Sequence, residues 1–322
     1  MRKHGKTLAV MLAAALLFGA LSGCASSEDG TDAEELKGPV VIGSKIDTEG
    51  ELISSIVKVT LEENGFEVQD KSQTGATEVV RKALIAGEID IYPEYTGSGF
   101  WFYGDTLSDD EKTAFKDGEA GYELVASLDL AEHGIVWLEP ARANNTWAIA
   151  VREDFAEEQG LETMSDFTEY VKAGKTTKVA ASDEFFTNLD ANPEFERVYG
   201  YTLTADQQVR LAGGNTAATE KAVADGTDGV NFGMAYGTDG ALADFGLVVL
   251  EDDRGAQLVY WPTPIATGEI MERYPEIAGL LEPVMASLTM EKLQELNARI
   301  QVNGEDADEV ARDFLIAGGL IE

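Results

Sequence analysis

The stretch that decides the fold runs from Phe66 to Gly99 and reads FEVQDKSQTGATEVVRKALIAGEIDIYPEYTGSG. Its apolar spacing predicts, in order, a strand at Phe66–Gln69, a helix at Thr77–Ala86 and a strand at Glu88–Tyr92. A strand at Val40–Gly43 and a helix at Glu51–Asn64 are predicted ahead of it. This β-α-β-α-β order is typical of a parallel, doubly wound sheet.

A second α/β unit is predicted further along the chain, after helices over 105–134. Strands at Ile135–Leu138 and Trp147–Val151 precede it. Its own elements are a helix near Met164–Ala173, a strand at Lys178–Ala181, a helix at Ala217–Ala224, and strands at Val230–Ala235 and Gly246–Leu250, and Leu258–Trp261 is a further predicted strand. From Pro264 onward the pattern predicts helices only, and no fixed-period repeat is present.

The N-terminus has the pattern of an export signal. Basic residues precede an apolar run at Thr7–Leu21, which is too short to span a bilayer comfortably. The run ends in Leu21-Ser22-Gly23-Cys24, which looks like a bacterial lipobox, and Cys24 is the one cysteine in the chain. We therefore expect a signal peptide over 1–23, lipidation of Cys24, and an acidic, unstructured tether over 24–38.

The charge of the chain excludes one large class of partners. There are 59 acidic and 24 basic residues, for a formal charge of -35. Removal of Arg2, Lys3 and Lys6 with the signal leaves 21 basic residues and a charge of about -38. Such a surface repels phosphate backbones, so we expect no nucleic-acid partner.

Catalytic and metal-binding motifs are not visible in the sequence. His133 is the only histidine after the signal, and its place at a predicted helix end is typical of a structural residue. There is no P-loop, G-x-S-x-G or calcium-loop pattern, and Gly213-Gly214-Asn215-Thr216 is better explained as a turn that caps a helix. We expect no enzyme activity, cofactor or metal, although a surface lipoprotein hydrolase and a structural or adhesive lipoprotein stay as alternatives.

Aromatic residues are grouped at the ends of predicted strands. They occur in Ile91-Tyr92-Pro93-Glu94-Tyr95-Thr96-Gly97, Asn144-Asn145-Thr146-Trp147, Met234-Ala235-Tyr236-Gly237-Thr238-Asp239 and Leu258-Val259-Tyr260-Trp261-Pro262. Ligands of open α/β sheets bind at the carboxyl ends of strands. Any one of these aromatics taken alone is more often a packing residue than a ligand contact.

These motifs together resemble a known family, the substrate-binding lipoproteins of osmoprotectant ABC importers, which take up glycine betaine, choline, carnitine and related quaternary amines. The resemblance covers residues 39–322. It is carried by Gly43-Ser44-Lys45 with Thr48-Glu49, by Thr74–Leu84 leading into Gly87–Gly97, by Asn144–Trp147, by Glu184-Phe185-Phe186-Thr187 and by Ala235–Asp239, in the family's order.

The resemblance implies an aromatic cage whose four rings belong to Tyr95, Trp147, Tyr236 and Tyr260. A trimethylammonium group has no proton to donate, so the faces of aromatic rings are suited to hold it, at about 0.5–2 kcal/mol per contact. Trp147 stands where the family usually has Tyr, and indole binds cations more strongly than phenol does.

The resemblance also implies polar contacts to the ligand. Asn145 offers an oxygen to the cation, Ser98 helps to fix the polar end of the ligand, and Lys45 matches a position that contacts a ligand carboxylate in some relatives. Asn188 occupies a place where relatives commonly carry Arg. Without that guanidinium a bidentate contact to a carboxylate is lost, which favours choline over glycine betaine.

The architecture that follows from the resemblance is a two-lobe clamshell of the type II periplasmic-binding-protein class. Each lobe is expected to hold a mixed, mainly parallel sheet flanked by helices, with two crossover strands between the lobes. Lobe 1 is expected to comprise 39–146 and 262–322, and lobe 2 to comprise 147–261. The expected partners are a permease and an ATPase in trans, with the chain anchored at the outer face of the bacterial cell membrane.

Overall fold

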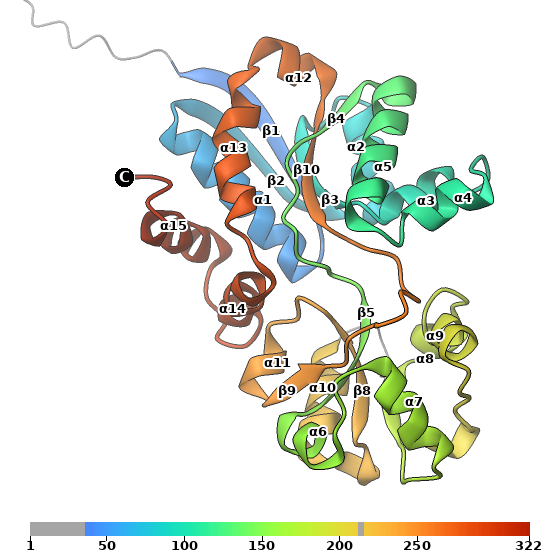
Figure 1. Cartoon of the computed structure of the whole chain (residues 1–322). Coiled ribbons are helices and arrows are strands. Elements are labelled where there is room, and N and C mark those ends of the chain that lie inside the picture. The colour runs from blue at the N-terminus through green and yellow to red at the C-terminus, as the bar shows by residue number, and fades with distance from the viewer. Residues whose placement is uncertain (1–35, 212–215) are drawn as a thin grey trace, which may run out of the picture. The chain divides into compact units, whose positions relative to one another are not determined.

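Two five-stranded mixed sheets organise the chain, and their strand orders are β2-β1-β3-β10-β4 and β7-β6-β8-β5-β9 (Figure 1). The computed structural model describes residues 36–211 and 216–322. The predicted signal peptide, Cys24, most of the tether and the Gly213–Asn215 turn lie outside these residues. We call the first sheet with its helices lobe 1 and the second sheet with its helices lobe 2.

Lobe 1 is formed by both ends of the described chain. Its strands are β1 (Lys37–Lys45), β2 (Phe66–Gly75), β3 (Ile91–Tyr95), β4 (Ile135–Trp137) and β10 (Pro262–Thr267). Its helices are α1 (Thr48–Glu63), α2 (Thr77–Ile85), α3 (Ser98–Tyr103), α4 (Asp109–Ala114), α5 (Gly118–His133), α12 (Gly268–Arg273), α13 (Glu276–Ala286), α14 (Met290–Gln301) and α15 (Ala307–Ala317).

Lobe 2 is formed by the middle of the chain. Its strands are β5 (Trp147–Arg152), β6 (Val179–Ser182), β7 (Gln208–Leu211), β8 (Phe232–Tyr236) and β9 (Leu247–Val249). Its helices are α6 (Glu153–Gln159), α7 (Met164–Lys172), α8 (Asp183–Thr187), α9 (Asn192–Tyr199), α10 (Thr216–Asp225) and α11 (Ala241–Asp244), with short 3-10 turns at Ala205–Gln207 and Thr227–Gly229.

The two sheets have the same topology. In each, the first three strands pair in parallel, and the fourth, β10 or β5, pairs antiparallel with both of its neighbours. These two strands are also the ones that the chain enters directly after passing from one sheet to the other (Figure 1). The expected mixed, mainly parallel sheets are therefore confirmed.

Helix α1 shows how the sequence places residues at the edge of the lobe 1 sheet. The Asp47 side chain accepts a 2.7 Å hydrogen bond from the Gly50 backbone N–H and so caps the helix at the end of β1. Leu52, Ile53 and Ile56 then lie on the buried face of the helix, which packs on the sheet. The first turn of α1 is thus fixed beside the carboxyl ends of β1 and β3.

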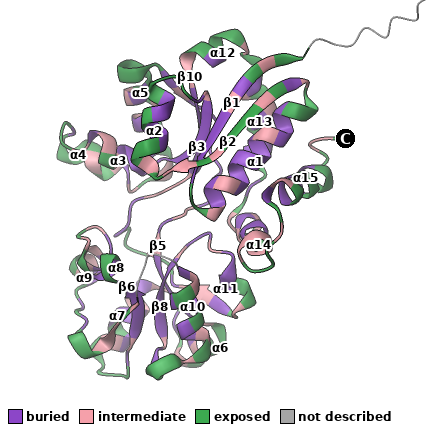
Figure 2. Ribbon diagram, turned by 180° about the vertical axis from the view of Figure 1, so that it is seen from behind, coloured by how far each residue is buried: buried purple, intermediate pink, exposed green. Residues whose placement is uncertain are grey.

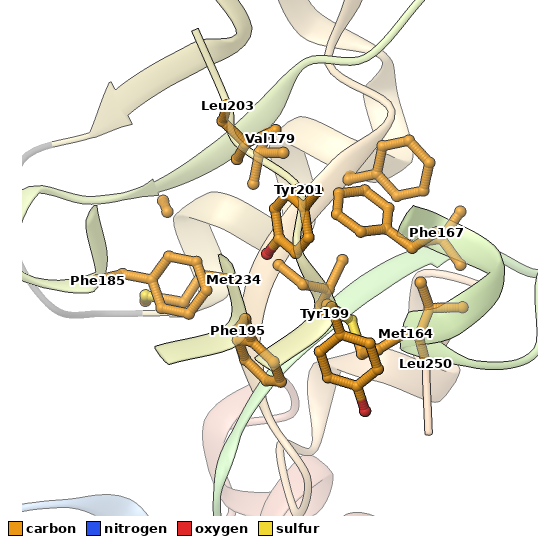
Figure 3. Close-up of a cluster of buried hydrophobic side chains, with 14 of the residues drawn as sticks. Met164, Phe167, Val179, Phe185, Phe195, Tyr199, Tyr201, Leu203, Met234 and Leu250 are labelled. Atoms are coloured by element: carbon orange, nitrogen blue, oxygen red, sulfur yellow. The ribbon is translucent and has the colours of Figure 1, made fainter. Parts of the chain in front are cut away.

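Each lobe has its own apolar core, with buried strands between more exposed helices (Figure 2). The lobe 2 core is rich in aromatic rings (Figure 3). Phe167 packs edge-to-face on Phe232 at 4.8 Å between ring centroids and on Tyr201 at 5.2 Å. The Tyr201 hydroxyl donates to Asn192 Oδ1 at 2.9 Å, so this buried polar group is satisfied.

Helix α14 of lobe 1 also contacts lobe 2, beside the two segments that join the sheets (Figure 1). Gln294 Nε2 donates to the Gly237 carbonyl at 2.8 Å, and Asn297 Nδ2 donates to the Thr238 carbonyl at 2.9 Å. A Cβ atom at Gly240 would lie 2.2 Å from the backbone nitrogen of Ala298, so only glycine allows this approach. At another place Lys116 pairs with Glu194 of α9 at 2.9 Å.

Several predicted elements are corrected by the structure. Leu258–Trp261 is not a strand, and the strand β10 occupies Pro262–Thr267, where only helices were expected. The elements α3, α8, α9 and β7 were not predicted. Lys37 and Gly38, assigned to the tether, belong to β1, because the Lys37 N–H donates to the Gly65 carbonyl and pairs the chain with β2.

The division into lobes at 146/147 and 261/262 stays a prediction, although β5 begins at Trp147 and β10 begins at Pro262. Among the described residues, no helix has both the length and the apolar character needed to cross a membrane.

Candidate ligand-binding site

A cavity of about 1090 Å³ is lined by residues of both lobes. All of the predicted site residues line it, namely Lys45, Tyr95, Ser98, Asn145, Trp147, Tyr236 and Tyr260. Tyr95 and Tyr236 are the last residues of β3 and β8, and Trp147 is the first residue of β5. The topology therefore brings residues that are distant in sequence together around one cavity.

Two of the predicted cage rings belong to lobe 2 and contact one another. Trp147 and Tyr236 are directly opposite in the antiparallel pairing of β5 with β8. Their ring centroids are 4.6 Å apart with an interplanar angle of 34°. Phe185 supports Trp147 from α8 at 5.6 Å. The cross-strand pairing thus makes a continuous aromatic wall.

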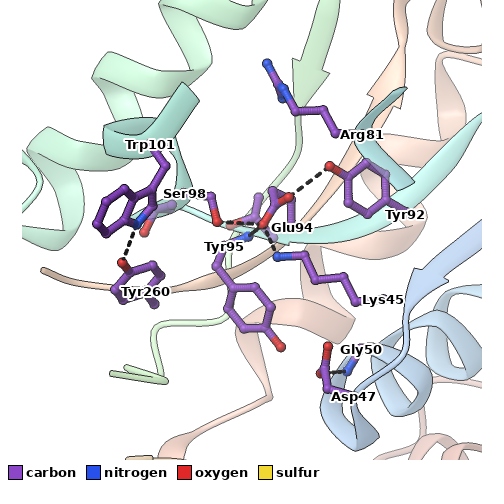
Figure 4. A network of polar contacts seen from close by, with 12 residues as sticks. Lys45, Asp47, Gly50, Arg81, Tyr92, Glu94, Tyr95, Ser98, Trp101 and Tyr260 are labelled. Carbon is purple, nitrogen blue, oxygen red and sulfur yellow. Dashed lines mark hydrogen bonds and ion pairs between the residues drawn. The ribbon is translucent and has the colours of Figure 1, made fainter. Parts of the chain in front are cut away.

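Tyr260 lies against lobe 1 and has a partner that the sequence analysis missed. Its hydroxyl accepts a 3.0 Å hydrogen bond from Trp101 Nε1 of α3 (Figure 4). A Cβ atom at Gly97 would lie 2.7 Å from the Tyr260 ring, so the backbone at Gly97 is the surface on which that ring rests. Burial raises the pKa of Tyr260 to about 12, which keeps the phenol neutral.

Lys45 and Ser98 are held by Glu94, a fully buried carboxylate of β3 (Figure 4). Lys45 Nζ forms an ion pair with Glu94 Oε1, and Ser98 Oγ donates to the same oxygen at 2.8 Å. Lys45 Nζ also lies 4.7 Å from the centroid of the Tyr95 ring. Lys45, predicted to contact a ligand carboxylate, and Ser98, predicted to fix the polar end of the ligand, are therefore already engaged by a carboxylate of the protein.

Glu49, in the first turn of α1, is a second buried carboxylate of the cavity. Its Oε1 accepts from the Tyr95 hydroxyl at 3.1 Å and from Asn145 Nδ2 at 2.9 Å, and its Oε2 accepts from Asn297 Nδ2 at 2.8 Å. Burial raises the pKa of Glu49 to about 7, although the hydrogen bonds from Thr238, Asn297 and Asn145 oppose this.

Lobe 2 carries an acidic pair behind Tyr236. Asp239 Oδ2 accepts from the Tyr236 backbone N–H at 2.7 Å, and Asp239 lines the cavity. Glu220 of α10 is fully buried, and no donor among the described residues reaches its oxygens. Burial, with repulsion from Asp239, raises the pKa of Glu220 well above its usual range. The raised pKa favours the neutral form of Glu220, so two full negative charges are not forced together in this buried place.

The charges that line the cavity favour a cation. Its basic side chains are each paired with an acid, Lys45 with Glu94, Arg81 with Asp129, and Lys82 with Glu78. Its acidic side chains are Asp47, Glu49, Glu78, Glu184 and Asp239. Asn188, which stands where relatives commonly carry Arg, lines the cavity as a neutral residue.

Sequence reasoning missed Trp101, Asn297 and the role of Glu49. Trp101 lies in the aromatic run Phe100-Trp101-Phe102-Tyr103. This run was a usable signal for the helix α3, which the sequence analysis did not predict. Glu49 belongs to the Thr48-Glu49 motif that helps to carry the family resemblance, but nothing in the spacing of that motif shows that the carboxylate is buried. Asn297 comes from the opposite end of the chain, and no local pattern marks it.

His133 gives no support to the hydrolase alternative. It is the last residue of α5, its Nε2 lies 3.7 Å from Glu132, and it is not among the residues that line the cavity. The described cavity therefore has no histidine that could activate a nucleophile there.

Comparison with known proteins places these features in context. Residues 38–317 match the model of the family described as the substrate binding domain of the ABC-type glycine betaine transport system. The chain is 49% identical over 277 residues to the glycine betaine-binding protein YehZ of Escherichia coli, covering 86% of this chain and 90% of that one. It is 34% identical over 280 residues to a glycine-betaine-binding protein of Pseudomonas aeruginosa, covering 85% and 86%.

The fold agrees with these matches. The solved structure of apo YehZ from Escherichia coli superposes with a TM-score of 0.79 at 48% identity, covering 88% of this chain and 100% of that one. These relatives are described as binding proteins, and they do not support the hydrolase alternative. The chain therefore belongs to the family of substrate-binding domains of ABC-type glycine betaine transport systems, as its motifs and its two-lobe fold indicate.

Proposed function

We propose that this protein captures a quaternary ammonium compound of the choline or glycine betaine class in the cavity and delivers it to an ABC permease. The ligand's cationic group is held by the rings of Tyr95, Trp147, Tyr236 and Tyr260. The observation that supports this most strongly is that all four rings, which come from four separate segments of the chain, line one cavity.

The chemistry of the cavity agrees with such a ligand. Quaternary amines carry a diffuse charge and apolar methyl groups, which suits ring faces better than hydrogen-bond donors. The basic side chains of the lining are all paired with acids, so they offer little attraction to an anion. Contacts from both lobes would favour a closed arrangement when the ligand is present.

Tryptophan fluorescence titrated with choline, glycine betaine, carnitine and proline betaine tests the proposal. Trp147 and Trp101 both line the cavity, so occupancy should change the emission. Tyr236→Ala should weaken binding by about 10- to 30-fold, since a desolvated ring contact contributes roughly 2 kcal/mol. Tyr274→Ala, at the residue that follows α12 and outside the cavity, is the control. Absence of a response to every quaternary amine would overturn the proposal.

The site of action follows from the family. Substrate-binding proteins of ABC importers work outside the cytoplasmic membrane, and we further propose that lipidation of Cys24 anchors this chain there. The lipobox-like Leu21-Ser22-Gly23-Cys24 supports the anchor. Replacing Cys24→Ser should move the protein from the membrane fraction to the soluble fraction of cells. An unchanged distribution would contradict lipidation.

A further inference from the structure

Glu49 is a buried acid for which the structure provides no cation. Its side chain lines the cavity, and the residue is only 5% exposed. No lysine or arginine among the described residues forms an ion pair with it, because the nearby Lys45 is engaged by Glu94. A buried carboxylate is normally paired, and leaving one unpaired is costly. The position of Glu49 therefore leaves a negative charge whose partner must come from elsewhere.

The hydrogen bonds of Glu49 connect this charge to the aromatic cage. The Tyr95 hydroxyl donates a hydrogen bond to Glu49 Oε1 at 3.1 Å. This bond polarises the O–H group and makes the aromatic ring richer in electrons. Asn145 and Asn297 donate to the two oxygens and fix the orientation of the carboxylate. All of these donors are neutral, so they stabilise the ionised form without cancelling its charge.

We propose that Glu49 is a specificity-determining residue, whose buried carboxylate selects a permanently cationic ligand over an uncharged molecule of the same shape and strengthens the hold of the Tyr95 ring on the cation. This inference rests on the proposed function. The ligand class that it predicts is a quaternary amine with a net positive charge, such as an amino alcohol, ahead of a zwitterion whose carboxylate would meet like charge in the cavity.

Binding is then linked to the proton on Glu49. Burial raises the pKa of the Glu49 carboxyl to about 7, so in the free protein near neutrality a fraction of the molecules carries it protonated. A bound cation favours the ionised form and lowers that pKa. Affinity for the cation is therefore fully present above pH 7 and is lost as the pH falls below it.

Other ionisable groups near Glu49 have to be considered as sources of a pH effect. They are Asp47 at the cap of its own helix, Tyr95 on β3, Lys45 on β1 with its partner Glu94, and Asp239 beyond β8 with its partner Glu220. Burial raises the pKa of Tyr95 well above its usual value, so it does not titrate near neutral pH. Burial also raises the pKa of Asp239 and of Glu220, so this pair is the rival source of a pH effect that the test controls for.

The test compares choline with 3,3-dimethylbutan-1-ol, an alcohol of the same shape in which carbon replaces the charged nitrogen. Isothermal titration calorimetry is run on the wild type, on Glu49→Gln and on Glu157→Gln, a matched substitution at an exposed residue of α6 outside the cavity. Glu49→Gln should lower choline affinity on the order of tenfold and leave the alcohol nearly unchanged. Glu157→Gln should change neither.

Equal losses for choline and the alcohol would show that Glu49 serves only to hold the cavity together, and they would overturn the inference. A second measurement is the affinity of the wild type for choline between about pH 5.5 and 8.5, with Glu220→Gln as the control. This measurement decides the question if the alcohol binds too weakly to be measured. A flat profile overturns the inference, and so does a transition that Glu220→Gln abolishes.

Tetramethylammonium distinguishes the inference from the proposed function. If it binds while choline affinity shows no dependence on Glu49 or on pH, the cage stands and the specificity role fails. If neither tetramethylammonium nor any larger quaternary amine binds, the proposed function itself fails.

Discussion

Tyr95 in lobe 1 and Tyr236 in lobe 2 end the corresponding third strands of two sheets with the same topology, β3 and β8. Each is opposite the first residue of the antiparallel fourth strand, which is Pro262 for Tyr95 and Trp147 for Tyr236. In lobe 2 the opposite residue adds a ring that stacks on the tyrosine. In lobe 1 it adds none, and the tyrosine is instead surrounded by charged groups.

This difference shows that the repeated topology places side chains but does not determine their chemistry. The lobe 2 wall is held by ring stacking, and no hydrogen bond from a described residue reaches the Tyr236 hydroxyl or the Trp147 indole nitrogen. The lobe 1 rings are held by polar contacts, from Tyr95 to Glu49 and from Trp101 to Tyr260. The substitutions below separate these two ways of holding a ring.

The largest effect is expected for the pH dependence of stability through Glu49. Its folded-state pKa of about 7 lies above the ordinary value of 4.5, so between these values the native protein binds more protons than the unfolded chain. The free energy of unfolding should therefore fall relative to Glu49→Gln as the pH rises from 5 to 8, by roughly 3 kcal/mol. Urea denaturation of the wild type and of Glu49→Gln at several pH values measures this free energy. If it depends on pH in the same way in both proteins, the raised pKa of Glu49 is contradicted.

A methyl group at Gly97 should come next in size. Gly97→Ala places Cβ about 2.7 Å from the Tyr260 ring, which must move away from Trp101. We expect a loss of about 1–3 kcal/mol in ligand binding or stability, as for other overpacked sites. Gly279→Ala, in α13 with open space around its Cβ position, is the matched control and should be neutral or stabilising. A Gly97→Ala protein that binds ligand normally would mean that the position of Tyr260 is not critical.

Removing single hydroxyl groups compares the two lobes most directly. Tyr95→Phe leaves Glu49 with one donor fewer and should cost about 1 kcal/mol of ligand binding. Tyr236→Phe removes a hydroxyl to which no described residue is hydrogen-bonded and should change affinity less than about twofold. Calorimetry with the same quaternary amine measures both. Equal effects would remove the distinction between polar and stacked rings.

The smallest effect is expected for Lys116→Met. The ion pair between Lys116 and Glu194 joins the lobes but is partly exposed, and such pairs contribute about 0–1 kcal/mol. Affinity should change less than about threefold, and raising the salt concentration should affect the wild type and the variant alike. A larger change would show that this contact, and not the rings, controls the approach of the lobes.

Most of the long elements were predicted because their apolar periods are clear. Those periods indicated a parallel sheet, and the mixed sheets were expected only from the family resemblance. Strand β10 was missed because Pro262 and Pro264 lack the N–H that a central strand normally donates. The structure tolerates them since their carbonyls still accept, from Ala141 and Leu138. The short helices α3, α8 and α9 have too few turns to show a period.

For the site, the strand-end aromatics and the family resemblance indicated seven residues, all of which line the cavity, and their roles in binding stay predictions. The partners of these residues could not be read in the same way. Glu94 and Glu49 are charged residues in apolar surroundings, a placement that composition and periodicity treat as improbable. Asn297 is 248 positions away from Glu49 in the sequence, and only the tertiary fold brings the two together.

The contact of α14 with lobe 2 has a mechanical consequence. Two extended segments alone would let the lobes both bend and twist about the line that joins them. Helix α14, which lies to one side of those segments in Figure 1, adds a third attachment. There Gly240 lies against the backbone of Ala298. A contact to one side of the two segments restricts the twisting of one lobe against the other. We therefore expect bending to be the main freedom left, so that the lobes approach each other in a similar orientation each time.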